Sequence, residues 1–258
     1  MLSKNTISFI RSLHQKKFRE QEQLFIAEGH KLVDELLESG YAIQSVVATE
    51  KAMSDFEDRL SGRVGEVYTA TEKDLERISA LTTPQHVLAV AAIPRRSLKL
   101  SDLEAKLTLL LDDVRDPGNM GTILRIAHWF GVGQVICSLN SVDAYHPKVV
   151  QASMGSLFHM PVYEAGLEGL LSELKQVSKI PVYATVLGGE DMFQTKLSNE
   201  GVIIFGNESM GIRTSLQELA TTRLSIPSFE SSSGNRPESL NVAVSAAIVL
   251  AEFSKQRR

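Results

Sequence analysis

Three short segments, far apart in the sequence, carry polar side chains beside turn-forming residues. They span residues 113–125, 205–212 and 225–244. Their amide, carboxylate, hydroxyl and guanidinium groups belong to Asn119, Arg125, Asn207, Glu208, Ser239 and Asn241. Groups of these types bind and orient polar ligands, because together they supply both hydrogen-bond donors and acceptors.

The first segment follows a short, leucine-rich apolar run at 107–111. Residues 116–119 after it are turn formers, so we expect a strand, a tight loop and then a helix. Open α/β folds place their ligands at such junctions, and the free N–H groups of a helix start suit an anionic partner. The alternative is an ordinary capped turn, with Arg125 solvated on the helix surface.

The other two segments have a similar design. Gly206 and Gly211 flank the amide of Asn207 and the carboxylate of Glu208, so the backbone can approach a ligand closely there. In the third segment a helix begins near Ser239 and continues with apolar residues almost all round. Such a helix is buried on most faces, and we expect part of its surface to form a subunit interface.

Strands and helices alternate along the whole chain, which predicts an α/β protein. In the first half we expect a small α/β sandwich, with strands at 24–27, 43–48, 64–68 and 87–93 and helices at 3–13, 30–39, 52–60 and 71–78. In the second half we expect a mostly parallel sheet with helices on both faces, with strands at 107–111, 134–138, 182–186, 202–205 and 223–226 and helices at 122–130, 148–157, 167–177, from about 214, and 240–253. Proline and positive charge at 94–99 break the pattern, which predicts two domains, 1–97 and 98–258.

The composition is that of a soluble globular protein, with 43% apolar and 22% charged residues among 258. The net charge of -4 neither supports nor excludes nucleic acid, so RNA binding would require a local basic surface. One such surface is the N-terminal helix and the turn after it, with Lys4, Arg11, Lys16, Lys17 and Arg19. We consider two interpretations, a phosphate-contacting arm and a solvated amphipathic helix.

Several other classes are disfavoured. The single cysteine, Cys137, lies in an apolar run, which indicates a buried thiol and a reducing, cytoplasmic setting. No apolar run is long enough for a membrane span. The 131–133 glycine pair follows a helix and precedes a strand, so it is a helix cap and not a dinucleotide fingerprint. No paired-cysteine zinc pattern occurs, and we expect no metal.

The three segments, in order, resemble the three motifs of the SpoU (TrmH) branch of the SPOUT RNA methyltransferases. The matching residues are Asn119-x-Gly121-x-x-x-Arg125, Gly206-Asn207-Glu208-x-x-Gly211, and Ile226-Pro227 with Ser239-Leu240-Asn241-Val242. The basic helix, residues 25–29 and residues 83–85 look like the small substrate-binding domain that precedes the catalytic domain in many members. The resemblance therefore covers nearly the whole chain.

This resemblance implies a homodimer with a deep trefoil knot in the C-terminal part. It implies methyl transfer from S-adenosylmethionine to a ribose 2′-hydroxyl, and it favours ribosomal RNA over transfer RNA as the substrate. The alternatives are an inactive RNA-binding protein of this fold and an enzyme that methylates a base atom. By similarity, the cofactor-binding residues are Thr185, Leu187, Gly188, Gly206, Asn207, Gly211, Ile226 and Leu240. The catalytic centre implied is Arg125, Asn119, Glu208, Ser239 and Asn241, and Lys148 joins the basic N-terminal residues in RNA binding.

Residue types suggest roles within that centre. An arginine stays protonated, so we favour Arg125 as an orienter of the ribose oxygen or a phosphate over Arg125 as the base. Asn119 is expected to orient Arg125 or the loop, and Glu208 to pair with Arg125 or to form a structural ion pair. Residues 228–237 make the third motif longer than usual, as either a lid or a surface loop, and Gln151 stands where many relatives have arginine.

Overall fold

The computed structural model describes residues 2–228 and 238–256. The chain folds into two compact units, of which the first comprises Met1–Arg95 and Asp143–His159 and the second comprises Arg96–Val142 and Met160–Arg258. The first crossing between them lies within the predicted linker. The segment 143–159, which lies within the predicted second domain, groups with the first unit in the fold.

The first unit contains a four-stranded mixed sheet in the order β1-β4-β2-β3. Strand β4 pairs antiparallel with β1 and β2, and β2 pairs parallel with β3. The strands are β1 (Leu24–Glu28), β2 (Ile43–Ala48), β3 (Val64–Thr69) and β4 (Val87–Ala92). The helices are α1 (Lys4–Ser12), α2 (Lys16–Glu22), α3 (His30–Glu38), α4 (Glu50–Met53), α5 (Glu57–Leu60) and α6 (Glu72–Ile78). The helix predicted at 52–60 is thus two short helices, and the predicted basic turn is helix α2.

Amphipathic helices bury the two faces of this sheet. Helices α1 and α6 place Ile7, Ile10 and Ile78 against Val47 and Val90 in one core cluster. Helix α3 packs on β1 and β4 and buries Leu32, Val33, Leu36 and Leu37. The predicted α/β sandwich is therefore present.

The segment 143–159 packs on the first unit because its apolar residues meet an aromatic cluster there. Helix α8 (Pro147–Ser153) and the 3-10 helix η2 (Ser156–His159) belong to it, and α8 packs against β1. The ring of Phe25 lies 5.0 Å from that of Tyr145 and 5.8 Å from that of Phe158. These contacts between residues far apart in the sequence place the segment in the first unit.

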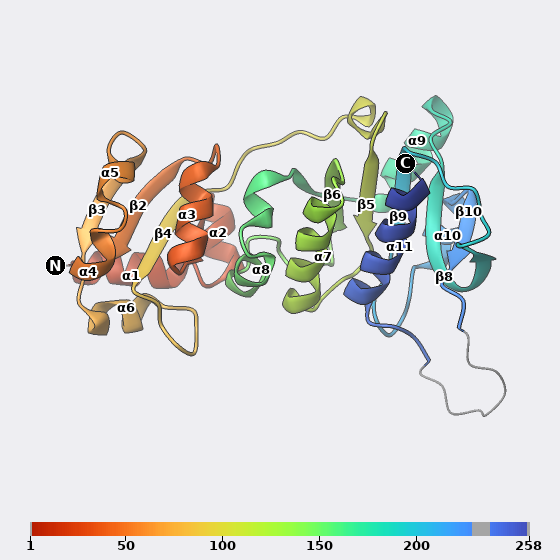
Figure 1. Cartoon of the computed structure of the whole chain (residues 1–258). Helices are drawn as coiled ribbons and strands as arrows, with labels where there is room; N and C mark the ends of the chain where they lie inside the picture. The colour runs from red at the N-terminus through yellow and green to blue at the C-terminus, as the bar shows by residue number, and fades with distance from the viewer. Residues whose placement is uncertain (1, 229–237, 257–258) are drawn as a thin grey trace. The chain divides into compact units, whose positions relative to one another are not determined.

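The second unit is a six-stranded, fully parallel sheet in the order β10-β8-β9-β5-β6-β7 (Figure 1). The strands are β5 (Leu107–Leu111), β6 (Gln134–Ser138), β7 (Val162–Ala165), β8 (Val182–Asp191), β9 (Gly201–Phe205) and β10 (Thr222–Ser225). Strand β7 was not predicted. All six strands point the same way, so the loops that follow them emerge at one edge of the sheet.

Helices cover both faces of this sheet, as predicted. Helices α7 (Pro117–Trp129) and α11 (Val242–Gln256) pack side by side. Helices α9 (Leu167–Val177) and α10 (Thr214–Leu219) form another pair, whose Leu171 and Leu216 share a core cluster with Leu110 of β5. The 3-10 helix η1 (Leu100–Leu103) precedes β5. The thiol of Cys137 is buried, with its Sγ 3.9 Å from the Sδ of Met120 in α7, which confirms the buried thiol.

Within the described residues, no helix has the length and apolarity that crossing a membrane requires.

Candidate active site

The loop after β5 holds Asn119 at the edge of the sheet. Asp116 caps α7, since its Oδ1 accepts a hydrogen bond from the Asn119 backbone N–H at 2.8 Å. Pro117 occupies the first helical turn, where its missing N–H costs nothing. Asn119 therefore lies in the first turn of the helix, with its side chain free to meet other loops.

The loop after β9 is a tight turn that presents Glu208. Asn207 and Gly211 exchange two backbone hydrogen bonds, of 3.1 and 2.9 Å. A Cβ at Gly206 would lie 2.3 Å from the backbone carbon of Gly211, so only glycine fits there. The Asn207 side chain accepts from the N–H groups of Ser209 and Met210 and donates to the carbonyl of Asp113 at 2.9 Å. Its amide therefore builds the turn and joins it to the loop after β5.

The third segment begins α11 with Asn241. The Oδ1 of Asn241 accepts from the backbone N–H of Ala243 at 2.9 Å and of Val244 at 3.3 Å. These are helix-start donors that have no partner within the helix, so Asn241 acts as an N-cap. Its Nδ2 remains available as a donor.

A hydrogen-bonded chain of three side chains joins the three segments. The Nδ2 of Asn241 donates to the Oδ1 of Asn119 at 2.9 Å, and the Nδ2 of Asn119 donates to the Oε1 of Glu208 at 2.6 Å. The groups at the two ends fix which atoms donate and which accept. The N–H groups of α11 require the Asn241 Oδ1 as their acceptor, and an ionised carboxylate can only accept. The amide orientations follow from this network, and the predicted convergence of the segments is present.

Arg125 and Ser239 stand apart from this chain. Arg125 is exposed on α7, on the same face as Thr122 and Trp129. Within the described residues of this chain, no hydrogen bond or ion pair joins Arg125 to Glu208, and the partner of the Glu208 Oε1 is Asn119. Ser239 is exposed beside the start of α11. We expected Asn119 to orient either Arg125 or the loop. Its side chain bonds to Glu208 in the loop after β9, so it orients a loop and not Arg125.

Residues predicted to bind the cofactor lie at the ends of adjacent strands. Thr185 is in β8, Gly206 follows β9 and Ile226 follows β10. Strand β8 bulges between Ala184 and Glu190 against β10, and the Thr185 hydroxyl in the bulge donates to the carbonyl of Ile204 at 2.7 Å. The edge is apolar as well as polar, because Leu187 and Leu240 are 79% and 47% exposed. Exposed apolar side chains suit a flat heteroaromatic ligand.

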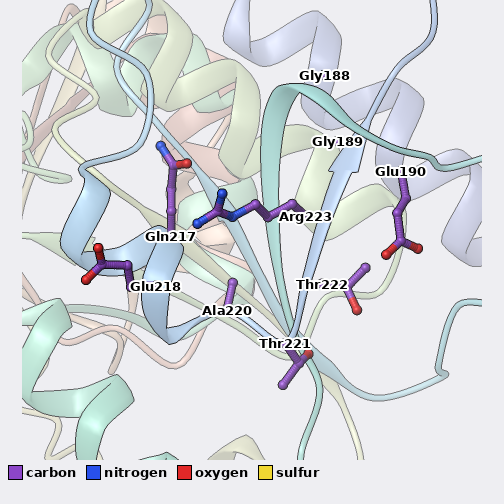
Figure 2. Close-up of a pocket in the computed structure, with 9 residues that line it drawn as sticks. All are labelled: Gly188, Gly189, Glu190, Gln217, Glu218, Ala220, Thr221, Thr222 and Arg223. Atoms are coloured by element: carbon purple, nitrogen blue, oxygen red, sulfur yellow. The ribbon is translucent and has the colours of Figure 1, made fainter.

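A pocket of about 590 Å³ opens beside the bulge of β8. It is lined by Gly188, Gly189, Glu190, Gln217, Glu218, Ala220, Thr221, Thr222 and Arg223 (Figure 2). Figure 2 shows the side chain of Arg223 pointing toward Gln217, with Glu190 on the opposite side of the strand. The pocket shares Gly188 with the predicted cofactor residues but contains none of the three-residue chain. The hydrogen-bonded chain is therefore separate from the lining of this pocket.

Sequence reasoning missed an ion pair, between a buried aspartate and an exposed arginine, that supports the loop after β9. Asp112 is fully buried at the end of β5. Its Oδ2 accepts from the backbone N–H of Arg213 at 2.9 Å, and its Oδ1 accepts from the guanidinium Nε at 2.8 Å. The Asp112 carboxylate raises the pKa of Arg213. An aspartate directly after an apolar strand was the available signal, because a buried carboxylate requires donors.

Most of the predicted RNA-binding residues lie at the surface, but one of them is buried. Lys4, Arg11, Lys16, Lys17 and Lys148 are exposed on the first unit. Arg19 is 1% exposed, pairs with Asp143 at 2.6 Å and donates to the carbonyl of Leu13 at 2.8 Å. Its assignment to RNA binding was wrong, because the guanidinium is used to hold residue 143 against α1 and α2.

His146 lies close to this ion pair and caps α8. Its Nδ1 accepts from the backbone N–H of Lys148 at 3.2 Å, which requires that nitrogen to be unprotonated. Burial lowers the pKa of His146, and the charge of Arg19 lowers it further. The expected lid or loop at 228–237 lies outside the described residues except for Ser228.

Comparison with known proteins connects this geometry to a family. Residues 106–251 match the SpoU rRNA Methylase family, and residues 4–89 match the MRM3-like substrate binding domain. The chain is 32% identical to the 23S rRNA (guanosine(2553)-2′-O)-methyltransferase RlmP of Bacillus subtilis, over 93% of this chain and 92% of the relative.

Two solved structures have the same fold over almost their whole length. A TrmH-family protein from Porphyromonas gingivalis has a TM-score of 0.88 and 38% identity, and the match covers 99% of both chains. An AdoMet-bound rRNA methyltransferase from Sinorhizobium meliloti has a TM-score of 0.85 and 31% identity, and the match covers 99% of this chain and 96% of the other.

Proposed function

The chain belongs to the SpoU rRNA methylase family, and we propose that it transfers the methyl group of S-adenosylmethionine to a ribose 2′-hydroxyl of ribosomal RNA. The observation that carries the proposal is the chain Asn241 to Asn119 to Glu208, which connects all three motifs of the family. An RNA-binding protein that had lost catalytic activity would not need these three side chains to be hydrogen-bonded to one another.

Ribosomal RNA is the substrate class that the relatives favour. RlmP of Bacillus subtilis is named for a guanosine 2′-hydroxyl of 23S rRNA and aligns with nearly the whole of this chain. The Sinorhizobium meliloti structure is also named an rRNA methyltransferase. We place the protein in the cytoplasm, on the basis of the single buried thiol.

The chemistry requires positioning and the removal of one proton. S-adenosylmethionine supplies an electrophilic methyl group on a sulfonium, and the ribose oxygen must be aligned with it. Arg125, exposed and protonated, binds the ribose oxygen or the adjacent phosphate through its planar fork of donors. The new C–O bond would form as the bond between the methyl group and the sulfonium breaks, S-adenosylhomocysteine would leave, and the ribose hydroxyl would become acidic. The Glu208 carboxylate, held by Asn119, takes up the released proton.

The cofactor is held at the strand ends beside this centre. Backbone groups around Gly206 and Ile226 would hold its adenosine, and the exposed apolar side chains of Leu187 and Leu240 would pack against it. These groups lie at the carboxyl edge of the parallel sheet, where α/β folds bind nucleotides. The deep trefoil knot implied by the resemblance belongs to this same region.

We further propose a homodimer formed through α7 and α11. Trp129 on α7 is 84% exposed and Val244 on α11 is 49% exposed, which are large apolar areas to leave in water. Arg125 lies on the same exposed face of α7 as Trp129. A second copy seated there covers the apolar surface and closes the site around Arg125.

The product of the reaction tests the proposed function. The protein is incubated with labelled S-adenosylmethionine and with large-subunit ribosomal RNA transcribed in vitro, and the RNA is digested to nucleosides. We expect label in a 2′-O-methylnucleoside. Label on a base would indicate a different SPOUT reaction, label appearing only with transfer RNA would overturn the substrate class, and no label with either RNA would overturn the enzymatic assignment.

A further inference from the structure

A second pocket, of about 610 Å³, lies in the first unit, whereas the three motifs belong to the second unit. It is formed where β2 and β3 end, where β4 begins and where α3, α4 and α6 start. Its volume is in the range of pockets that hold small organic ligands, roughly 300 to 1,000 Å³. The residues that face it include His30, Thr49, Lys51, Thr71, Gln85 and His86.

A buried carboxylate fixes one wall of this pocket. Glu28, 5% exposed at the end of β1, accepts hydrogen bonds from the backbone N–H groups of Ala80 and Gln85, both at 3.1 Å, and from the hydroxyl of Ser79. Gly29 follows with a φ of 106°, and a Cβ there would lie 3.5 Å from Cγ of Gln85. The loop before β4 is thereby held against the start of α3, with Gln85 placed on the pocket wall.

His30 is held at the pocket from several sides. Its ring centroid lies 4.6 Å from that of Phe56, which is fully buried. Its Nδ1 is 3.4 Å from a carboxylate oxygen of Asp34, and its Nε2 is 3.5 Å from one of Asp55. The side chain is still 52% exposed, so much of the ring surface is available to a ligand.

The charges of the lining decide which part of a nucleotide fits. Three carboxylates, Glu50, Asp55 and Glu72, face one ammonium group, that of Lys51. This excess of negative charge repels a phosphate. The N–H donors on the edge of a neutral base, in contrast, can be accepted by the carboxylates. The hydroxyls of Thr49 and Thr71 already cap α4 and α6, and the Nε2 of Gln85 donates to the carbonyl of Thr83 at 3.3 Å, so Oε1 is the group that the Gln85 amide offers to a base.

We propose that this pocket binds an unpaired nucleobase of the substrate RNA, stacked on His30 and hydrogen-bonded by Gln85. The inference rests on the proposed function, since it assumes that RNA is the substrate. Proteins that select an RNA sequence typically take single-stranded bases onto aromatic or histidine side chains and read their edges by hydrogen bonds. The exposed cations of α1, Lys4 and Arg11, then contact phosphates outside the pocket.

Binding measured at several salt concentrations separates the two kinds of contact. The probe is large-subunit ribosomal RNA transcribed in vitro, and the proteins are wild type, His30→Ala, Gln85→Ala and, as a matched control, Lys4→Ala. We expect His30→Ala to weaken binding by about 5- to 100-fold, the usual effect of removing one stacking platform. The dependence of log affinity on log salt should keep its slope in both pocket variants and become shallower by about one unit in Lys4→Ala.

Methyl transfer by the same proteins gives a second readout. In the pocket variants the KM for RNA should rise, while kcat and the Kd for S-adenosylmethionine stay at their wild-type values. Wild-type affinity in both pocket variants would overturn the inference, as would a shallower salt slope in them, which would assign a phosphate contact. If the wild type binds the transcript but methylates no ribose, the proposed function fails, while the binding comparison still decides the pocket.

Discussion

The amide of Asn119 donates to the Oε1 of Glu208 at 2.6 Å, although 89 positions separate the two residues. This contact connects the loop after β5 to the loop after β9 and holds the carboxylate in one orientation. Glu208 is therefore held by a neutral amide, and Arg125 is left exposed for the substrate.

Replacing Glu208 by glutamine separates charge from geometry. Gln still accepts from Asn119 but does not take up a proton, so we expect Glu208→Gln to lower kcat by roughly 100-fold, within the usual range for a general base. The Kd for S-adenosylmethionine should stay unchanged. If Glu208→Gln retained full activity while Glu208→Ala lost it, the carboxylate would serve only to hold Asn119.

Arg125 should matter for the reaction and hardly at all for folding. We expect Arg125→Ala to reduce methyl transfer by at least about 100-fold, because a positioned donor is lost at the reacting oxygen. Arg125→Lys should recover only part of the rate, since lysine lacks the fork. The free energy of unfolding should change by no more than about 0.5 kcal/mol, as for other surface positions. Thr122→Ala, on the same face of α7, is the control, and a normal rate in Arg125→Ala would remove Arg125 from the site.

The lowered pKa of His146 predicts a pH-dependent stability. The unfolded chain binds a proton on His146 near the ordinary pKa of 6.5, whereas the folded chain binds it only at lower pH. The contribution of His146 is therefore fully present above that pH and is lost as the pH falls below it. His146→Asn keeps an N-cap acceptor and cannot titrate, so its urea midpoint should fall less than that of the wild type on acidification. Equal falls in both proteins would contradict this assignment.

The proposed dimer predicts a change of mass after one substitution on α11. Ala251 is exposed two turns after Val244, so Ala251→Arg places a charge in the proposed interface. Sedimentation equilibrium should give twice 28.4 kDa for the wild type and 28.4 kDa for this variant. Glu218→Arg, on α10, is the matched control and should remain a dimer. A wild-type monomer that is fully active would refute the interface.

The sequence predicted most of the second unit because local signals agree there. Apolar runs mark β5, β6 and β9. The residues 117–119, predicted as part of a loop before a helix at 122, instead form the first turn of α7, because Asp116 caps the helix there. Strand β7 was missed, since its four residues, Val162–Ala165, form an edge strand without a clear alternation of polar and apolar side chains. The convergence of Asn119, Glu208 and Asn241 followed from the order of the motifs.

What local patterns could not predict were partnerships between distant residues. A buried arginine looks like any other basic residue until its partner is known, and Arg19 meets Asp143 from across the chain. The same holds for the rings that place α8 on the first unit. The sequence suggested Arg125 as the partner of Glu208, and only the geometry of the loops showed that Asn119 donates to it.

A double-mutant cycle on methyl transfer tests most directly whether the motifs act as one catalytic unit through this contact. The rates of wild type, Asn119→Ala, Glu208→Ala and the double variant are compared at saturating S-adenosylmethionine. Residues that work as a unit are strongly non-additive, so we expect the double variant to be about as slow as the slower single variant. A double variant whose loss equals the product of the two single losses would contradict the account, because Asn119 and Glu208 would then act independently.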